Sequence, residues 1–242
     1  MAKVWPKYGK KYASPIQKSY ITVGGFLWME TIMKHTLAAL ALVLGTASVA
    51  QAATITNGSF ETGTAPGAVG YRTINAVNST AIDGWTVTSG SIDYISTYWT
   101  ASDGRRSIDM SGGNVGTIST TITDLIVGYT YELLFDLSGN PAGAPPVKTV
   151  SVSVGSTGGV FTYDTSAGTP PTSLTDMNWI TQSLVFVATG STALLTFASG
   201  TGTAYGPALD NVRVSAVPLP AGGLLLLSGL AGFAALRRRK TA

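Results

Sequence analysis

The chain has 242 residues, of which 45% are hydrophobic and only 11% are charged, and its formal net charge is +3. The basic excess lies at the two ends, because residues 53–216 hold five basic and eleven acidic side chains, a net charge of −6 that argues against nucleic-acid binding. There is no cysteine, and the single histidine, His35, lies in a segment that we expect to be removed. Disulfides, Ser-His-Asp and Cys-His catalysis and the usual zinc sites are therefore excluded from the mature domain.

Residues 33–52 have the three parts of a secretory signal peptide. A short basic start precedes an apolar run at 37–44, and a small-x-small cleavage site follows, formed by Ala50 and Ala52. The alternative is a short buried helix, which such a short and uninterrupted run does not favour. We expect cleavage after Ala52.

Residues 1–32 carry five lysines and no clear apolar period. They are either an extended basic region of the signal peptide or the result of a translation start placed too far upstream. In the second case translation begins at Met29 or Met33. We expect no folded structure to depend on this segment.

Residues 53–216 are expected to form one all-β domain, a β-sandwich or jelly roll. Gly, Ser, Thr and Val dominate, and short alternating runs separated by Gly-rich and Pro-rich turns recur, as half-buried strands require. The run SLVFV at 183–187 is apolar on both faces, which predicts a central strand. The other expected strands are 129–137, 149–154, 192–198 and 209–214.

The segment from Asp93 to Gly112 carries the candidate ligand-binding residues. Sugar-binding sites often stack a flat ring against the apolar face of a pyranose, so Tyr98 and Trp99 are the candidates for a groove, with hydrogen bonds from Asp103 and Arg105. The alternative for each aromatic residue is core packing. Asp103 and Asp109 form a conceivable carboxylate pair for glycoside hydrolysis, but their spacing alone does not place them across a cleft.

The last 26 residues read as a membrane-sorting tail. Val217-Pro218-Leu219-Pro220-Ala221 comes first, then an uncharged apolar stretch at 221–236, expected to be helical, then Arg237-Arg238-Arg239-Lys240. Sixteen helical residues span roughly 24 Å, against about 30 Å of hydrocarbon. The basic cluster should stay in the cytoplasm and leave the domain outside, while the prolines keep an extended segment open to a protease. The alternative is a simple anchor that is never cut.

Five motifs occur in the domain in the order NGSFE (57–61), DGW (83–85), GSIDYISTYWTASDGRRSIDMSG (90–112), GYTYELLFDLSGNP (128–141) and GPALDNVRV (206–214). Together they resemble the bacterial choice-of-anchor C family, which is related to a plant cell-wall protein family. The resemblance implies a jelly roll similar to galactose-binding domains, the fold of many carbohydrate-binding modules. The tail resembles a PEP-CTERM sorting signal of the VPLPA type, which implies processing by an exosortase-type enzyme.

The resemblance also implies a structural calcium ion, because related jelly rolls bind one with a glutamate after the first strand and an aspartate near the last. The matching residues are Glu61 and Asp210. Calcium prefers several oxygen ligands, which two carboxylates and backbone carbonyls can supply. The alternative is that both side chains cap turns or pair with an arginine.

These observations predict an exported, non-catalytic protein of the cell surface or extracellular matrix that binds polysaccharide and belongs to the envelope or biofilm. Its precursor is expected to be held in the inner membrane by the C-terminal helix before processing. Two alternatives remain: a glycoside hydrolase that uses two carboxylates, and a purely structural surface protein without a glycan ligand.

Overall fold

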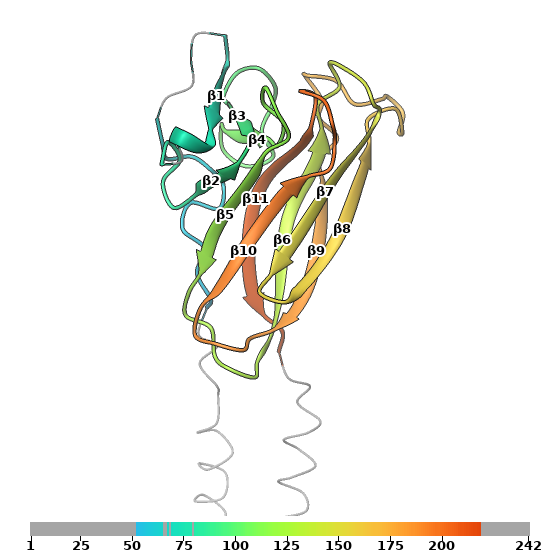
Figure 1. Ribbon diagram of the computed structural model, residues 1–242. Coiled ribbons are helices and arrows are strands. Elements are labelled where there is room, and N and C mark those ends of the chain that lie inside the picture. Colours follow the sequence, from blue (N-terminus) through green and yellow to red (C-terminus); the bar gives the residue numbers. More distant parts are fainter. Residues whose placement is uncertain (1–51, 65–66, 68, 79, 219–242) are drawn as a thin grey trace, which may run out of the picture. The chain divides into compact units, whose positions relative to one another are not determined.

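The computed structural model describes residues 52–64, 67, 69–78 and 80–218, which form a two-sheet β-sandwich (Figure 1). The predicted all-β sandwich is therefore confirmed. The expected signal peptide up to Gln51 and the tail from residue 219 lie outside the described residues. Among the described residues, no helix is both long and apolar enough to span a membrane. The described elements are β1 (Tyr71–Asn75), the 3-10 helix η1 (Ala76–Asn78), β2 (Thr86–Ser89), β3 (Ser91–Ile95), β4 (Ser107–Asp109), β5 (Thr117–Ile122), β6 (Thr130–Gly139), β7 (Val147–Val154), β8 (Thr157–Asp164), β9 (Ile180–Val187), β10 (Ala193–Ser199) and β11 (Pro207–Ala216).

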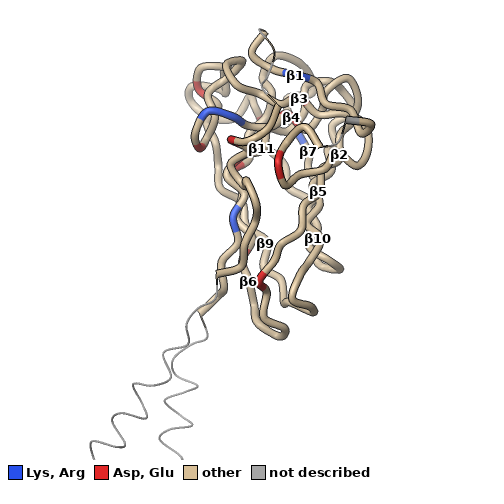
Figure 2. Tube along the Cα trace, turned by 90° about the vertical axis from the view of Figure 1, so that its left-hand side faces the viewer, with Lys and Arg blue, Asp and Glu red and all other residues tan. Residues whose placement is uncertain are grey.

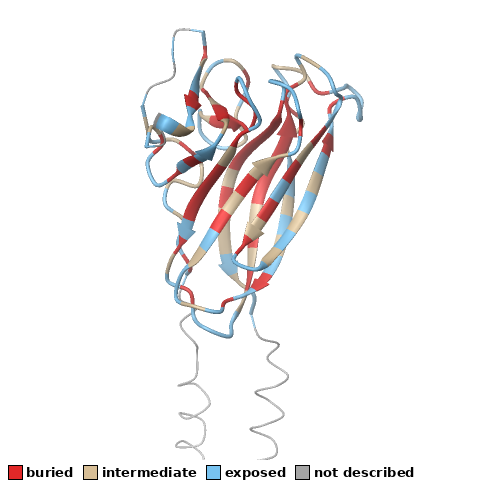
Figure 3. Cartoon of the chain, viewed as in Figure 1, coloured by how far each residue is buried: buried red, intermediate tan, exposed pale blue. Residues whose placement is uncertain are grey.

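Both sheets are antiparallel, and their order is β1-β3-β4-β11-β6-β9 in one and β2-β5-β10-β7-β8 in the other. Alternation of apolar and polar residues places one face of each strand in the core, because successive side chains of a strand point to opposite faces. Figure 3 shows this alternation along β7 and β10. As predicted for 129–137 and 149–154, one apolar face is buried, formed by Tyr131, Leu133, Phe135 and Leu137 in β6 and by Val150, Val152 and Val154 in β7. Tyr129, expected on the same face, precedes β6 and is 38% exposed.

The main core lies between the two sheets and contains a chain of aromatic rings. Phe135 of β6 meets Phe197 of β10 edge to face, with ring centroids 5.2 Å apart. Trp85 lies 6.2 Å from Phe197, and Phe60 lies 4.9 Å from Trp85. Aromatic side chains bury large apolar areas, so these contacts join both sheets and the N-terminal segment into one core.

The prediction of a central strand at 183–187 is wrong. β9 contains this segment and is an edge strand of the six-stranded sheet, paired only with β6. Val185 and Val187 are 53% and 55% exposed. An apolar run on both faces therefore does not show that both faces are buried, since here the outward face of the strand is left open.

The two described chain ends lie at one end of the sandwich (Figure 1). Thr54 pairs with Thr123, and the N–H of Val217 donates to the carbonyl of Thr130, the first residue of β6. β6 and β11 each have ten residues. At about 3.3 Å per residue, the far ends of these strands lie roughly 30 Å from the chain ends. Figure 2 shows that most charged positions gather at that far end, around β1, β3 and β4.

Replacement of Phe197 by alanine is expected to destabilise the domain by about 3–5 kcal/mol, because the buried ring contacts both Phe135 and Trp85. The matched control is Val160→Ala, since Val160 is 68% exposed on β8, and it should cost less than about 1 kcal/mol. Urea unfolding followed by tryptophan fluorescence measures both. Equal costs for the two variants would contradict the assigned core.

Candidate functional site

Residues 96–106, here called the 96–106 loop, connect β3 to β4 and are held at one end by Glu61. Glu61 Oε1 accepts hydrogen bonds from the backbone N–H groups of Arg105 and Arg106, at 2.7 and 2.8 Å. Gly104 has a φ of +68°, and a Cβ there would come within 2.4 Å of Glu61 Oε1. A glycine at this position therefore lets the carboxylate approach the loop backbone.

Asp210 of β11 holds the middle of the same loop. Its Oδ2 accepts hydrogen bonds from the N–H groups of Ser102 and Asp103, at 2.7 and 2.9 Å, and its Oδ1 accepts one from Asn211 at 2.6 Å. The side chain is fully buried. Burial raises the pKa of Asp210 to about 7, although the three N–H groups act in the opposite direction.

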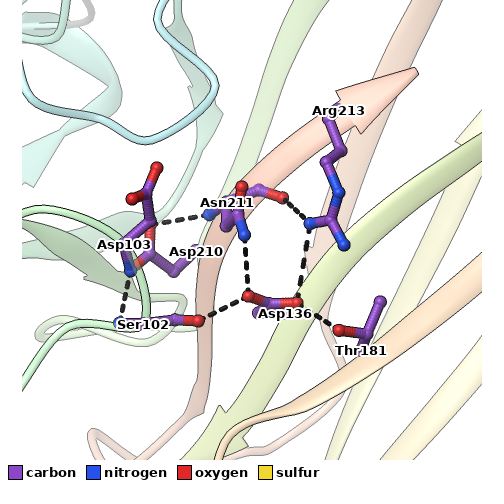
Figure 4. A network of polar contacts seen from close by, with 7 residues as sticks. All are labelled: Ser102, Asp103, Asp136, Thr181, Asp210, Asn211 and Arg213. Carbon is purple, nitrogen blue, oxygen red and sulfur yellow. Dashed lines mark hydrogen bonds and ion pairs between the residues drawn. The ribbon is translucent and has the colours of Figure 1, made fainter. Parts of the chain in front are cut away.

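A third carboxylate, Asp136 of β6, fixes the loop to the outward face of the six-stranded sheet (Figure 4). It accepts hydrogen bonds from the hydroxyl of Ser102, from Thr181 Oγ1 at 2.7 Å and from Asn211 Nδ2 at 3.0 Å, and Arg213 lies 3.7 Å away. Burial alone would raise the pKa of Asp136, but these hydrogen bonds and the guanidinium charge outweigh it and lower the pKa. Asp136 is therefore a structural anion.

Glu61 and Asp210, the predicted calcium ligands, both face the 96–106 loop, but they accept hydrogen bonds from its N–H groups. This geometry is the alternative in which the carboxylates cap turns. Calcium needs six to eight oxygen ligands. Within the described ranges, no three His, Cys, Asp or Glu side chains are grouped so as to hold a metal ion. The calcium site remains a prediction.

A small pocket of about 160 Å³ opens on the outward face of the six-stranded sheet, at the end far from the chain termini. Ile92 and Tyr94 of β3 point into the main core, so the alternate residues Asp93 and Ile95 point outward. Asp93 lies opposite Asp109 of β4 in the strand register. We call this cavity the tyrosine pocket; its lining is Tyr71, Asp93, Ile95, Tyr98, Asp109, Asn140, Ala204 and Tyr205.

Asp109 orders the base of the tyrosine pocket. Its Oδ1 accepts hydrogen bonds from the N–H groups of Ser111 and Gly206, at 2.9 and 3.0 Å, and its Oδ2 accepts one from Asn140 Nδ2 at 2.8 Å. A Cβ on Gly206 would lie 2.5 Å from Oδ1, so this approach requires glycine. Asp109 is 1% exposed, and burial raises its pKa to about 7.

Lys148 of β7 holds the wall of the pocket from behind. Its buried Nζ donates to the backbone carbonyls of Gly143 and Tyr205, each at 2.7 Å. A Cβ on Gly143 would lie 2.2 Å from the Tyr205 ring, so the ring packs directly on the backbone there. Burial lowers the pKa of Lys148, and the nearby Asp109 partly opposes this effect. Lys148 thus joins two loops that meet at the pocket.

Three tyrosines form the mouth of the pocket. Tyr71 and Tyr98 pack edge to face with ring centroids 5.3 Å apart, and Tyr205 is 40% exposed. The pKa of Tyr98 is raised by burial and by the neighbouring Tyr71, Tyr205, Asp109 and Asp93. Because these groups lie close together, the pocket combines aromatic rings with carboxylate oxygens.

Tyr98 also lines a neighbouring open groove of about 380 Å³, formed by the 96–106 loop together with Leu174 and Thr175. Trp99 contributes to the groove but is only 4% exposed, and its Nε1 donates to Ser107 Oγ at 2.7 Å. Trp99 supports the loop from below, whereas Tyr98 stands between the groove and the tyrosine pocket.

Residues 53–215 match the model of the family described as "Protein of unknown function (DUF642)". The chain belongs to the DUF642 family. It is also 32% identical over 173 residues to halomucin from Haloquadratum walsbyi, a match that covers 71% of this chain and 2% of halomucin. The chain therefore spans only a small part of that curated relative.

The DUF642 domain is also similar to solved carbohydrate-binding modules. One is the CBM22-1 xylan-binding domain of Paenibacillus barcinonensis Xyn10C (19% identity, 66% of this chain, 100% of that chain, TM-score 0.39). A second is a family 35 module from Clostridium thermocellum (12% identity, 60% of this chain, 98% of that chain, TM-score 0.41). A third is TmCBM61 solved with β-1,4-galactotriose (14% identity, 67% of this chain, 97% of that chain, TM-score 0.40).

The structure of the DUF642 domain places the residues that the sequence singled out in different surroundings. Tyr98 and Arg105 line the groove, and Trp99 lies beneath it. Asp103 lines neither cavity, and its N–H donates to Asp210. Asp109 faces the tyrosine pocket instead, so the suggested pair of Asp103 and Asp109 shares neither of these cavities.

Sequence reasoning missed Tyr71, Asp93, Asn140 and Tyr205, which come from four separate segments. Each is unremarkable in its own run, and only the pairing of β3 with β1 and β4 and of β6 with β11 brings them together. The available signal was Asp93, an acid between the apolar residues Ile92 and Tyr94.

Stability is expected to fall as the pH rises from about 4 to about 7. The raised pKa values of Asp109 and Asp210 mean that the folded state keeps protons which the unfolded state, with an ordinary carboxyl pKa of 3.8, has released. This stabilisation is complete below about pH 4 and is lost as the pH passes about 7; the lowered pKa of Asp136 acts oppositely, but only below about pH 4.

The urea midpoint measured from about pH 4.5 to about pH 8 tests this trend. Asp109→Asn should flatten it, whereas Asp124→Asn, at an exposed position far from the pocket, should not. A midpoint that rises with pH in the wild type would show that the buried carboxyls do not control stability.

Proposed function

We propose that this DUF642 protein is an exported, non-catalytic protein of the cell surface or extracellular matrix that binds polysaccharide through the tyrosine pocket and the adjoining groove. The observation that carries the proposal is the shared position of Tyr98, which lines both cavities. One ring can thus contact two successive sugar units of a chain.

The lining of the tyrosine pocket suits a sugar. A pyranose has apolar C–H faces, which pack on aromatic rings, and hydroxyl groups, which need hydrogen-bond partners. Tyr71 and Tyr205 supply rings, and Asp93 supplies carboxylate acceptors. Asn140 is already committed, since its Nδ2 donates to Asp109 and its Oδ1 accepts from Ala142. A few fixed polar groups among rings are typical of small-molecule sites.

The end-to-end arrangement supports a surface role. Asn140 follows β6 and Tyr205 precedes β11, so the pocket lies at one end of these strands, and Val217 lies at the other. We propose that the tail beginning at Val217 is a PEP-CTERM signal of the VPLPA type, as in choice-of-anchor C proteins, which an exosortase-type enzyme cuts. The pocket then points away from the membrane that holds the precursor. Support for this processing comes from the sequence of the tail.

The geometry gives little support to a glycoside hydrolase. A general acid must present a proton to the leaving group. Asp109 is 1% exposed and accepts three N–H hydrogen bonds, so both of its oxygens are already occupied by hydrogen bonds within the protein. Asp93, the acid opposite Asp109, is the other carboxylate among the described lining residues of the pocket. The pocket therefore does not present the two free carboxyl groups that hydrolysis requires.

Tyr98→Ala should weaken polysaccharide binding by about tenfold or more, because it removes a ring from both cavities. The measurement is retention of the protein on immobilised polysaccharides, including exopolysaccharide from the producing organism, in calcium and in EDTA. The control is Tyr129→Ala, which removes a tyrosine of 38% exposure near the chain termini.

Equal loss with both variants would place binding elsewhere. Failure of the folded wild type to bind any polysaccharide with calcium present would overturn the proposal and favour a structural protein without a glycan ligand. Binding that EDTA abolishes would support the predicted calcium ion.

A further inference from the structure

The charged side chains that line the tyrosine pocket are all acidic. Its lining contains two carboxylates, Asp93 and Asp109, and three tyrosines, and no lysine or arginine is among its described lining residues. Lys148 lies behind the pocket wall, where its Nζ donates to two backbone carbonyls. Arg105 lines the neighbouring groove and not this pocket.

The two carboxylates are not equivalent. Asp109 is saturated by three N–H groups of the protein. Asp93 is half-buried, and among the described residues its carboxylate receives one hydrogen bond, from Thr73 Oγ1 to Oδ1 at 2.6 Å. Oδ2 of Asp93 is therefore the acceptor available to a ligand. Hydrogen bonds to charged groups are stronger than neutral ones, which makes sugar hydroxyls good partners.

The size of the pocket limits what can enter. A volume of about 160 Å³ equals roughly five water molecules at about 30 Å³ each. Such a space is about the size of one sugar ring, so the substituents of a bound ring lie close to Asp93. A carboxylate on the ligand would lie beside the carboxylate of Asp93, and like charges that are brought together away from bulk water repel.

We propose that the tyrosine pocket accepts a neutral sugar unit, which donates hydroxyl hydrogen bonds to Asp93, and excludes uronic acids. This inference rests on the proposed function, because it names the ligand class of the same site. The selectivity resides in Asp93, because its carboxylate accepts the hydrogen bond of a sugar hydroxyl and also repels a carboxylate on the ligand.

The test compares neutral polysaccharides with the same polymers after selective oxidation of their C6 hydroxyl groups to carboxylates. The probes are β-1,4-galactan, β-1,3-glucan and galactomannan, each in both forms, and the protein is the full chain. For a polymer that the wild type binds, oxidation should weaken binding at least tenfold. Asp93→Asn keeps an acceptor for Thr73 but removes the charge. Its affinities for the native and the oxidised polymer should therefore differ by no more than about threefold. Asp124→Asn, an exposed acid at the other end, should behave as the wild type.

The outcomes separate the two proposals. If the oxidised polymer binds the wild type as well as the native one, or if Asp93→Asn keeps the full discrimination, the inference is overturned while polysaccharide binding stands. If no probe binds in either form, the proposed function fails at this site and the inference fails with it. A thermal unfolding curve for Asp93→Asn, matched to the wild type, shows that altered selectivity does not come from misfolding.

Discussion

Three carboxylates that accept hydrogen bonds from backbone N–H groups hold together the end of the domain where the pocket lies. Glu61 and Asp210 fix the 96–106 loop, and Asp109 fixes the loop before β11. The loops at this end have no disulfide to restrain them, and their N–H groups lie outside the sheet ladders. Each of these side chains accepts at least two N–H hydrogen bonds, so a few carboxyl groups can fix long loops.

The sandwich is thus stabilised in two different ways along its length. Alternating apolar residues and the ring contacts between Phe135 and Phe197 hold the sheets together. Toward the pocket, buried polar groups take over: Lys148 with two carbonyls, and Asp136 with Ser102, Thr181 and Asn211. None of the buried side-chain nitrogen or oxygen atoms of the described residues lacks a partner. A network that is fully satisfied defines one geometry, which a binding site requires.

The sequence predicted the scaffold better than the site. Period-two alternation located β6 and β7 and their buried faces, because burial of one face is a local property of a strand. It misplaced β9, since an apolar edge strand and a central strand have the same composition. It singled out Tyr98, which lines both cavities, as a candidate ligand-binding residue, but not Tyr71 or Tyr205, whose position depends on contacts across distant segments. Nor could it show that Trp99 turns inward to Ser107.

The opposite placement of the pocket and Val217 has a mechanical consequence. If a polymer is held at the pocket while the chain is held beyond Val217, tension runs along β11 and the strand beside it, β6. These strands are joined by eight registered residue pairs in an antiparallel ladder. Tension parallel to the strands loads the rungs of this ladder together in shear, whereas tension across them would open the rungs one at a time. In that proposed arrangement, the load between the surface and the polymer would run parallel to β6 and β11.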